Sequence, residues 1–210
     1  MYAIAATSPL PAFMGETMET MNPTVPDETW GALWRGDRAA FSAVFQAHHK
    51  AVYNFAFRHT ASWATAEEAT QACFTTVWRR AREGSLPAIT HGSALAWLCG
   101  VARNECRNLT RGQTRHLRLV GRAEREPEHT HSNVDDWVAH EASMRRINQV
   151  LAQLPDQQRE VIEMVAWAGL GMTETAAALK VPVGTVKSRL ARARKTLATS
   201  EVAHLLGQEA

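Results

Sequence analysis

The sequence predicts an all-α protein, with two small helical bundles joined by a flexible linker and a helix-turn-helix in the C-terminal bundle. Apolar residues recur at helical spacing along most of the 210 residues, and no stretch combines strand-like alternation with turn pairs. A polar segment containing one proline, residues 125–133, interrupts this pattern and separates two basic blocks. Apolar residues make up 45% of the chain and charged residues 21%, which excludes a wholly disordered protein.

Both ends of the chain and the segment between the bundles are predicted to lack regular structure. The first 26 residues contain four prolines, no Lys or Arg and no sustained apolar period. The polar segment indicates a linker between domains. We therefore assign the chain as follows: a disordered tail over 1–30, an N-terminal domain over 31–115, a flexible linker over 116–140, a C-terminal domain over 141–198 and a C-terminal tail over 199–210.

Each domain is expected to consist of helices. In the first, apolar residues recur three or four positions apart over 41–55, 66–81 and 95–109. The second begins with two helices, one from Met144 that stops at Pro155 and one over 161–166. A short helix over 173–179, a turn over 180–184 and a helix from Thr185 then complete a helix-turn-helix pattern.

The last helix is apolar on one face and basic elsewhere. Val186, Leu190, Ala193 and Leu197 have helical spacing, and we expect them to pack on the bundle. Residues 180–195 contain six basic residues and no acidic one. Such charges repel one another unless anions neutralise them, and a helix in the major groove meets both phosphates and base edges. DNA binding is therefore favoured over a basic face that is only solvated.

A second basic pattern lies in the N-terminal domain, whose residues 31–115 hold 11 basic and 5 acidic side chains. Arg103, Arg107, Arg111 and Arg115 recur every four residues, which extends over about 18 Å of a helix. Like charges at this spacing repel by a few tenths of a kcal/mol per pair, whereas a phosphate backbone would attract all four. A DNA-facing surface is favoured, with a solvated face as the alternative.

The helix-turn-helix segment is similar to a known family. Residues 181–194 read Val-Pro-Val-Gly-Thr-Val-Lys-Ser-Arg-Leu-Ala-Arg-Ala-Arg, and residues 154–161 read Leu-Pro-Asp-Gln-Gln-Arg-Glu-Val. Both resemble region 4 of bacterial extracytoplasmic-function (ECF) sigma factors, which grips the promoter −35 element. The resemblance implies −35 contacts by Thr185, Lys187, Ser188, Arg189, Arg192 and Arg159. Two positions depart from the family pattern: Gly171 replaces a capping Ser, and Lys180 replaces a Gly expected in left-handed backbone.

Two segments of the N-terminal domain resemble region 2 of the same family. Residues 66–79, Ala-Glu-Glu-Ala-Thr-Gln-Ala-Cys-Phe-Thr-Thr-Val-Trp-Arg, are similar to region 2.2, which docks on the polymerase β′ coiled coil. Matching positions imply polymerase contacts by Glu68, Gln71 and Phe74. Residues 96–104, Ala-Trp-Leu-Cys-Gly-Val-Ala-Arg-Asn, are similar to regions 2.3 and 2.4, which hold the melted −10 element. This implies that Asn104 reads an exposed base, and that the four arginines bind −10 DNA.

The resemblance implies a two-domain sigma factor that binds core RNA polymerase and promoter DNA. Its expected partners on the polymerase are the β′ coiled coil and the β flap, and an anti-sigma factor is a further expected partner. We expect a cytoplasmic, nucleoid-associated protein without membrane insertion, because the first 30 residues lack the basic start of a secretory signal. Two alternatives stay open: a free-standing helix-turn-helix regulator that binds duplex DNA without core polymerase, and an adaptor without DNA affinity.

Enzymatic and metal chemistry are not expected. The nine histidines and three cysteines lack the spacing of a zinc site, and the sequence contains no phosphate-binding glycine loop and no nucleophile elbow. Cys99 and Cys106 lie seven residues apart on one expected helix, which puts their Cα atoms about 10 Å apart, too far for a disulfide. We therefore predict no cofactor, no metal and no catalytic residue.

Overall fold

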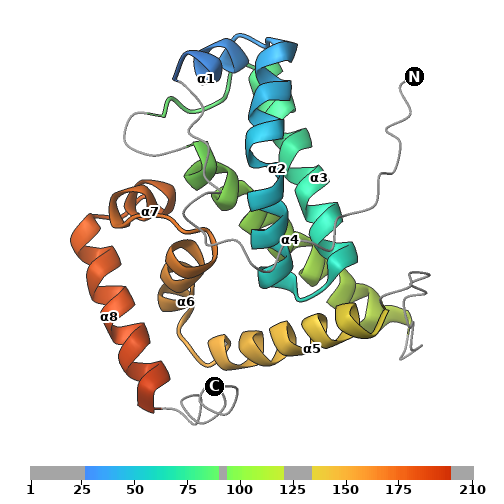
Figure 1. Ribbon diagram of the computed structural model, residues 1–210, viewed down its shortest axis with the longest axis vertical. Helices are drawn as coiled ribbons and strands as arrows, with labels where there is room; N and C mark the ends of the chain where they lie inside the picture. Colours follow the sequence, from blue (N-terminus) through green and yellow to red (C-terminus); the bar gives the residue numbers. More distant parts are fainter. Residues whose placement is uncertain (1–26, 90–93, 121–133, 200–210) are drawn as a thin grey trace.

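The computed structural model describes residues 27–89, 94–120 and 134–199 (Figure 1), and every regular element in these ranges is a helix. The all-α prediction is therefore confirmed. In chain order the elements are α1 (Asp27–Trp34), α2 (Arg38–Thr60), α3 (Trp63–Arg82), α4 (Ala94–Val120), α5 (Val134–Leu151), α6 (Asp156–Ile162), the π-helix η2 (Glu163–Trp167), α7 (Met172–Leu179) and α8 (Val183–Thr199). Helices α1–α4 lie together, and α5–α8 curve around one side of them (Figure 1).

The N-terminal bundle is built on α2, α3 and α4. Val44, Phe55, Val77 and Leu98 come from these three helices and are fully buried in one cluster. The start of α2 is fixed by Asp37, whose Oδ1 accepts hydrogen bonds from the backbone N–H groups of Ala39 (2.7 Å) and Ala40 (3.0 Å). Burial of the apolar stripe that the sequence shows on each helix holds this bundle together.

The predicted N-terminal tail is too long at its C-terminal end, because α1 begins at Asp27. Trp30 is buried, and its indole Nε1 donates to the carbonyl of Pro87 at 3.0 Å. Leu33, one turn later, is fully buried in the same core. Residues 27–34, which precede the first expected helix, therefore form a helix that packs on the core. Residues 1–26 of the predicted tail lie outside the described residues.

The predicted linker over 116–140 is shorter in the structure, because helices enter it from both sides. Helix α4 runs past Gly112 to Val120, and α5 begins at Val134. On α5, Glu141 Oε1 accepts from the backbone N–H of Trp63, the first residue of α3, at 2.9 Å. This contact anchors α5 to the N-terminal bundle. Residues 121–133 lie outside the described part of the chain.

The C-terminal bundle packs α8 against α6 and α7. Its cluster includes Leu151, Leu154, Val161, Val186 and Leu190. The helix predicted over 161–166 is divided, with α6 ending at Ile162 and the π-helix η2 following directly. The backbone N–H of Ala168 donates to the carbonyl of Glu163, five residues earlier, at 3.2 Å. Such wide turns occur frequently at functional sites.

The two bundles are packed against each other. Met164 of η2 and Leu170 are buried in the core of the N-terminal bundle. Arg58 Nη1 at the end of α2 donates to the carbonyl of Trp167 at 2.8 Å, and Asn148 Nδ2 of α5 donates to the carbonyl of Arg58 at 3.0 Å. The closed arrangement therefore combines apolar burial with hydrogen bonds to helix ends. None of the described helices is long and apolar enough to cross a membrane.

Candidate nucleic-acid interface

The helix-turn-helix forms where the sequence predicts it. Lys180 ends α7 in left-handed backbone (φ 54°, ψ 46°), as expected where the family pattern has Gly. Helix α8 begins at Val183, two residues before the predicted Thr185. At the start of α7, the N–H of Gly171 donates to Glu174 Oε2 at 2.9 Å. Glycine has no side-chain acceptor, so only the glutamate half of a capping box is present.

Helix α8 buries the apolar face predicted for it and exposes the basic one. Val186, Leu190 and Ala193 are buried against the C-terminal bundle, and Leu197 packs at its edge. The predicted −35 side chains Lys187, Ser188 and Arg192 are exposed, whereas Thr185 and Arg189 are half-buried. The Ser188 hydroxyl donates to the carbonyl of Thr185 at 3.1 Å, so it presents mainly acceptor capacity.

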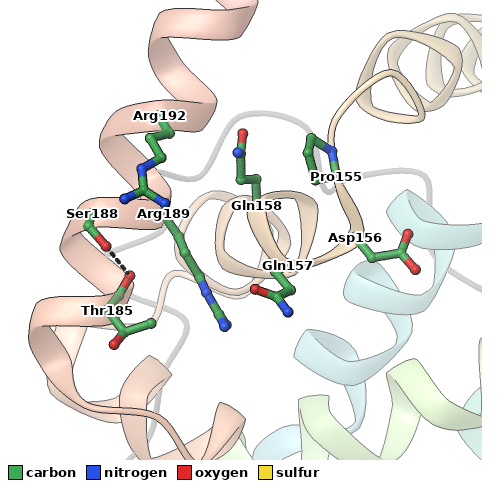
Figure 2. Close-up of a pocket in the computed structure, with 8 residues that line it drawn as sticks. All are labelled: Pro155, Asp156, Gln157, Gln158, Thr185, Ser188, Arg189 and Arg192. Carbon is green, nitrogen blue, oxygen red and sulfur yellow. Dashed lines mark hydrogen bonds between the residues drawn. The ribbon is translucent and has the colours of Figure 1, made fainter.

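A hollow of about 560 Å³ lies between α6 and α8, and four of the six predicted −35 residues line it: Thr185, Ser188, Arg189 and Arg192. Arg189 and Arg192 reach into it from α8, opposite Gln157 and Gln158 of α6 (Figure 2). Guanidinium and amide groups are the side chains that read guanine and adenine edges. The sequence did not single out Gln157 or Gln158, because their position opposite α8 depends on how the helices pack.

Arg159 is the one predicted −35 residue that does not lie on α8. Its Nη2 pairs with Asp156 Oδ1 at 3.0 Å, and its Nε lies 3.5 Å from Glu163 Oε1. These two carboxylates therefore hold the Arg159 guanidinium on the side of α6 that faces the N-terminal bundle.

The four arginines of α4 do not share one environment. A four-residue step on a helix of 3.6 residues per turn rotates by about 40°, so three steps rotate by about 120°. Arg103 is buried and Arg107 half-buried, whereas Arg111 and Arg115 are exposed. Asn104 is also exposed. The stripe predicted from the sequence therefore divides into a covered half and an open half.

Two glutamates of the C-terminal bundle hold the covered arginines. Arg103 Nη1 lies 2.7 Å from Glu160 Oε1, and its Nε lies 3.0 Å from Glu163 Oε2. Arg107 lies 3.9 Å from both Glu160 Oε1 and Asp156 Oδ2. The side chains of Arg103 and Glu163 are only 6% and 3% exposed, so this pair is almost completely removed from water. Neither glutamate was predicted as a partner of these arginines, because the pairs join segments that lie far apart in the sequence.

Burial shifts the pKa values of two groups near Arg103, the carboxyl of Glu163 and the ring of His59. It raises the pKa of Glu163, and the nearby guanidinium of Arg103 opposes that shift. Burial, together with the positive charges of Arg103, Arg159 and Arg107, lowers the pKa of His59 to about 4. His59 Nε2 lies 3.7 Å from Glu163 Oε2, and at neutral pH the ring there is uncharged. The positive charges that face Glu163 at neutral pH are therefore those of the arginines and not that of His59.

On the open half of α4, Arg111 and Arg115 form no ion pair with any other described residue. Helical geometry places Asn104 within about 20° of both arginines around the helix axis. This face presents two guanidinium groups beside an amide that both donates and accepts hydrogen bonds. It has the donors needed to bind a phosphate backbone and one base edge together.

The predicted polymerase residues lie on α3 but differ in exposure. Glu68 and Gln71 are exposed, whereas Phe74 is 3% exposed and packs edge-on against Phe45 of α2, with ring centroids 4.8 Å apart. Phe45 of α2 is 40% exposed. An exposed aromatic ring is characteristic of protein interfaces. The apolar contribution to this surface therefore comes from Phe45.

The three cysteines, Cys73, Cys99 and Cys106, are buried and free. Burial raises the pKa of each thiol, that of Cys106 to about 12. All three therefore remain protonated at neutral pH and are poor nucleophiles.

Two family models match most of the described chain. The model described as Sigma-70 region 2 matches residues 44–116, and the model described as Sigma-70, region 4 matches residues 144–197. The chain is 32% identical over 165 residues to the ECF RNA polymerase sigma factor SigK of Mycobacterium bovis, which covers 77% of this chain and 85% of SigK. It is 30% identical over 175 residues to the ECF RNA polymerase sigma factor RpoE of Cereibacter sphaeroides, covering 77% and 88%.

Two solved structures share the fold. One is CnrH in complex with the cytosolic domain of CnrY, with a TM-score of 0.59, 22% identity, and coverage of 88% of this chain and 98% of CnrH. The other is the sigma factor RpoE of Bartonella quintana in complex with the anti-sigma factor NepR, with a TM-score of 0.52, 23% identity, and coverage of 80% and 96%.

Proposed function

Since this chain belongs to the ECF family of RNA polymerase sigma factors, we propose that it binds core RNA polymerase and directs initiation at promoters by recognising −35 and −10 elements and promoting melting. Members of this family are transcription initiation factors, so the catalysis belongs to the polymerase. The observation that carries the proposal is the open basic face of α8 above the hollow shared with α6.

The −35 role is assigned to the residues around this hollow. Lys187 and Arg192 are exposed cations, and positions 180–195 contain no acidic residue. Arg189, Ser188 and Thr185 lie beside them along the same hollow. Phosphate contacts would position the helix, and the guanidinium groups would read base edges.

The −10 role is assigned to α4. Asn104 would take the exposed base, while Arg111 and Arg115 would hold the phosphates of the melted strand. Arg103 and Arg107 would join them once Glu160 and Glu163 move away. This assignment is supported by the match of residues 44–116 to region 2 and by the exposure of the Asn104 face.

The polymerase surface is assigned to α3 and the adjoining ring of α2. Glu68 and Gln71 would make polar contacts with the β′ coiled coil, and Phe45, supported from beneath by Phe74, would supply apolar area. The C-terminal bundle would meet the β flap. An anti-sigma factor is proposed as a further partner, because the NepR complex pairs such a factor with a protein of this fold. Its place of action would be the cytoplasm, at the nucleoid.

The deciding experiment is transcription with purified core polymerase on a pool of promoter fragments from the source genome. We expect transcripts from a subset whose upstream regions share two elements. The matched variant Gln71→Ala/Phe45→Ala should lose core binding, while Ser42→Ala/Gln46→Ala, on exposed positions of α2, should not. Tight duplex binding without any activation of core polymerase would instead support the free-standing regulator.

A further inference from the structure

The contact between Arg103 and the carboxylates of Glu160 and Glu163 joins the two bundles at the place assigned to −10 DNA. Arg103 extends from α4 of the N-terminal bundle, while the two glutamates belong to α6 and η2 of the C-terminal bundle. The guanidinium fork of arginine binds carboxylate and phosphate with the same geometry. The carboxylates that bind the Arg103 guanidinium therefore occupy the position that a phosphate would take.

We propose that Glu160 and Glu163 form an interdomain lock with Arg103 and Arg107, in which the C-terminal bundle competes with promoter DNA for the covered half of the α4 stripe. This inference rests on the proposed function, because it concerns the regulation of the same DNA surface. The lock keeps the chain closed, and any polyanion that binds the arginines opens it.

The dimensions of the closed molecule support the need for opening. Helix α7 contacts both α4 and α8, so only one helix separates the two DNA-facing helices. Neighbouring helix axes lie about 8–10 Å apart, which places α4 and α8 about 20 Å from each other where both contact α7. Positions −35 and −10 are separated by about 85 Å of duplex at 3.4 Å per base pair. The closed form therefore cannot engage both elements, and the bundles must separate.

Burial of the charged pair makes this contact sensitive to the loss of either partner. Removing one partner of such a pair leaves the other charge without water or counter-ion. A glutamate-to-glutamine change would leave the Arg103 guanidinium buried without its counter-charge. Separation of the two bundles would then expose this guanidinium to water. Replacing Arg103 instead leaves Glu163, whose raised pKa lets it take up a proton in place. The glutamate variants should therefore open the chain more than an Arg103 variant.

The test measures the distance between the bundles in the full chain. Spin labels on Ser42→Cys of α2 and Ala177→Cys of α7, both exposed positions, report separation by electron resonance, and the buried native thiols stay unlabelled. The key variant is Glu160→Gln/Glu163→Gln. Its control is Glu28→Gln/Glu83→Gln, which removes two exposed carboxylates far from the lock. Binding of unlabelled protein to a 20-nucleotide oligo(dT) is measured in parallel.

We expect the key variant to raise the open population about tenfold or more over wild type, and to bind oligo(dT) about fivefold or more tightly than its control. Arg103→Gln should also open the chain but bind oligo(dT) more weakly than wild type. Unchanged distances in the key variant, equal oligo(dT) affinity in the key and control variants, or tighter binding by Arg103→Gln would each overturn the lock. If the double variant loses its helical circular dichroism, Glu160→Gln alone is expected to give the same changes in smaller measure.

These measurements contain neither polymerase nor promoter, so they separate the lock from the proposed function. A chain that opens as expected but leaves core polymerase inactive keeps the lock and loses the sigma-factor role. A chain that supports transcription while both glutamate variants stay closed keeps the role and loses the lock.

Discussion

Helices α4 and α8 are both rich in basic residues, but these residues have very different surroundings. Each carries four or more basic residues without a compensating acidic stripe. On α8 the cations Lys187 and Arg192 are exposed, whereas on α4 the carboxylates of Glu160 and Glu163 cover Arg103. The difference shows that basic residues at helical spacing do not by themselves indicate an open surface, because on α4 carboxylates of the protein itself cover part of the stripe.

The largest expected effect concerns the open surface on α8. The variant Lys187→Ala/Arg192→Ala should lose duplex affinity for its −35 element by about 1–3 kcal/mol per residue that reads a base. The control Arg35→Ala/Arg38→Ala removes the same charge from the turn after α1 and the start of α2 and should change affinity little. Electrophoretic mobility shifts on a cognate promoter check this. Promoter binding equal to wild type would remove α8 from the interface.

The N-terminal bundle contains a buried histidine that should make the stability of the chain sensitive to acid. His48 is buried in the N-terminal bundle, neither ring nitrogen has a hydrogen-bond partner among the described residues, and burial lowers its pKa to about 4. In the unfolded chain the ring takes up a proton below about pH 6.5, whereas the folded ring stays neutral until about pH 4. Stability from this group is therefore present above pH 6.5 and falls as the pH decreases.

At pH 5 this loss amounts to about 2 kcal/mol. Urea unfolding of wild type at pH 7 and pH 5, compared with His48→Leu at the same two values, measures it. The variant should show the smaller pH dependence, because it has no proton to take up at this position. An equal pH dependence in both proteins would assign the acid sensitivity to other groups.

A smaller effect is expected on the open half of the α4 stripe. Arg111→Ala and Arg115→Ala should each change the free energy of unfolding by no more than about 0.5 kcal/mol, because both side chains are exposed. Each should weaken open-complex formation and reduce the slope of log affinity against log salt by about 0.7 for a single-stranded phosphate contact. A salt titration of open complexes checks both values, with Arg82→Ala as the exposed control on α3. Salt slopes identical to wild type would leave these arginines as a solvated face.

The smallest and most specific effect is expected for Asn104→Ala. Removing an amide that reads a base should leave closed-complex binding nearly unchanged and reduce melting only at promoters that carry one particular −10 base. Permanganate reactivity of thymines, measured over promoters varied one base at a time, tests this, with Asn108→Ala on the same exposed side as the control. Equal melting by wild type and variant on every promoter would show that Asn104 reads no base.

Local sequence predicted a large part of this molecule. The helices of both bundles and the buried face of α8 follow from apolar spacing. The left-handed backbone at Lys180 was implied by the resemblance to region 4, which has Gly at this position. The N-terminal boundary was missed because α1 is short and its stability comes from Trp30 and Leu33 packing against α2–α4. Likewise, α5 extends into the predicted linker because Glu141 is anchored at the start of α3.

The sequence by itself determined that α4 and α8 would be basic helices, because charge and helical period are local properties. Only the tertiary structure decided which cations are available to a ligand. Arg103 and Glu163 are 60 residues apart, and no periodic pattern links them. Their pairing depends on the π-turn at η2 and on Met164 and Leu170 entering the N-terminal core, which bring the carboxylates over α4. Burial of apolar surface is not directional, so the contacts it creates between distant segments are settled only when the whole chain packs.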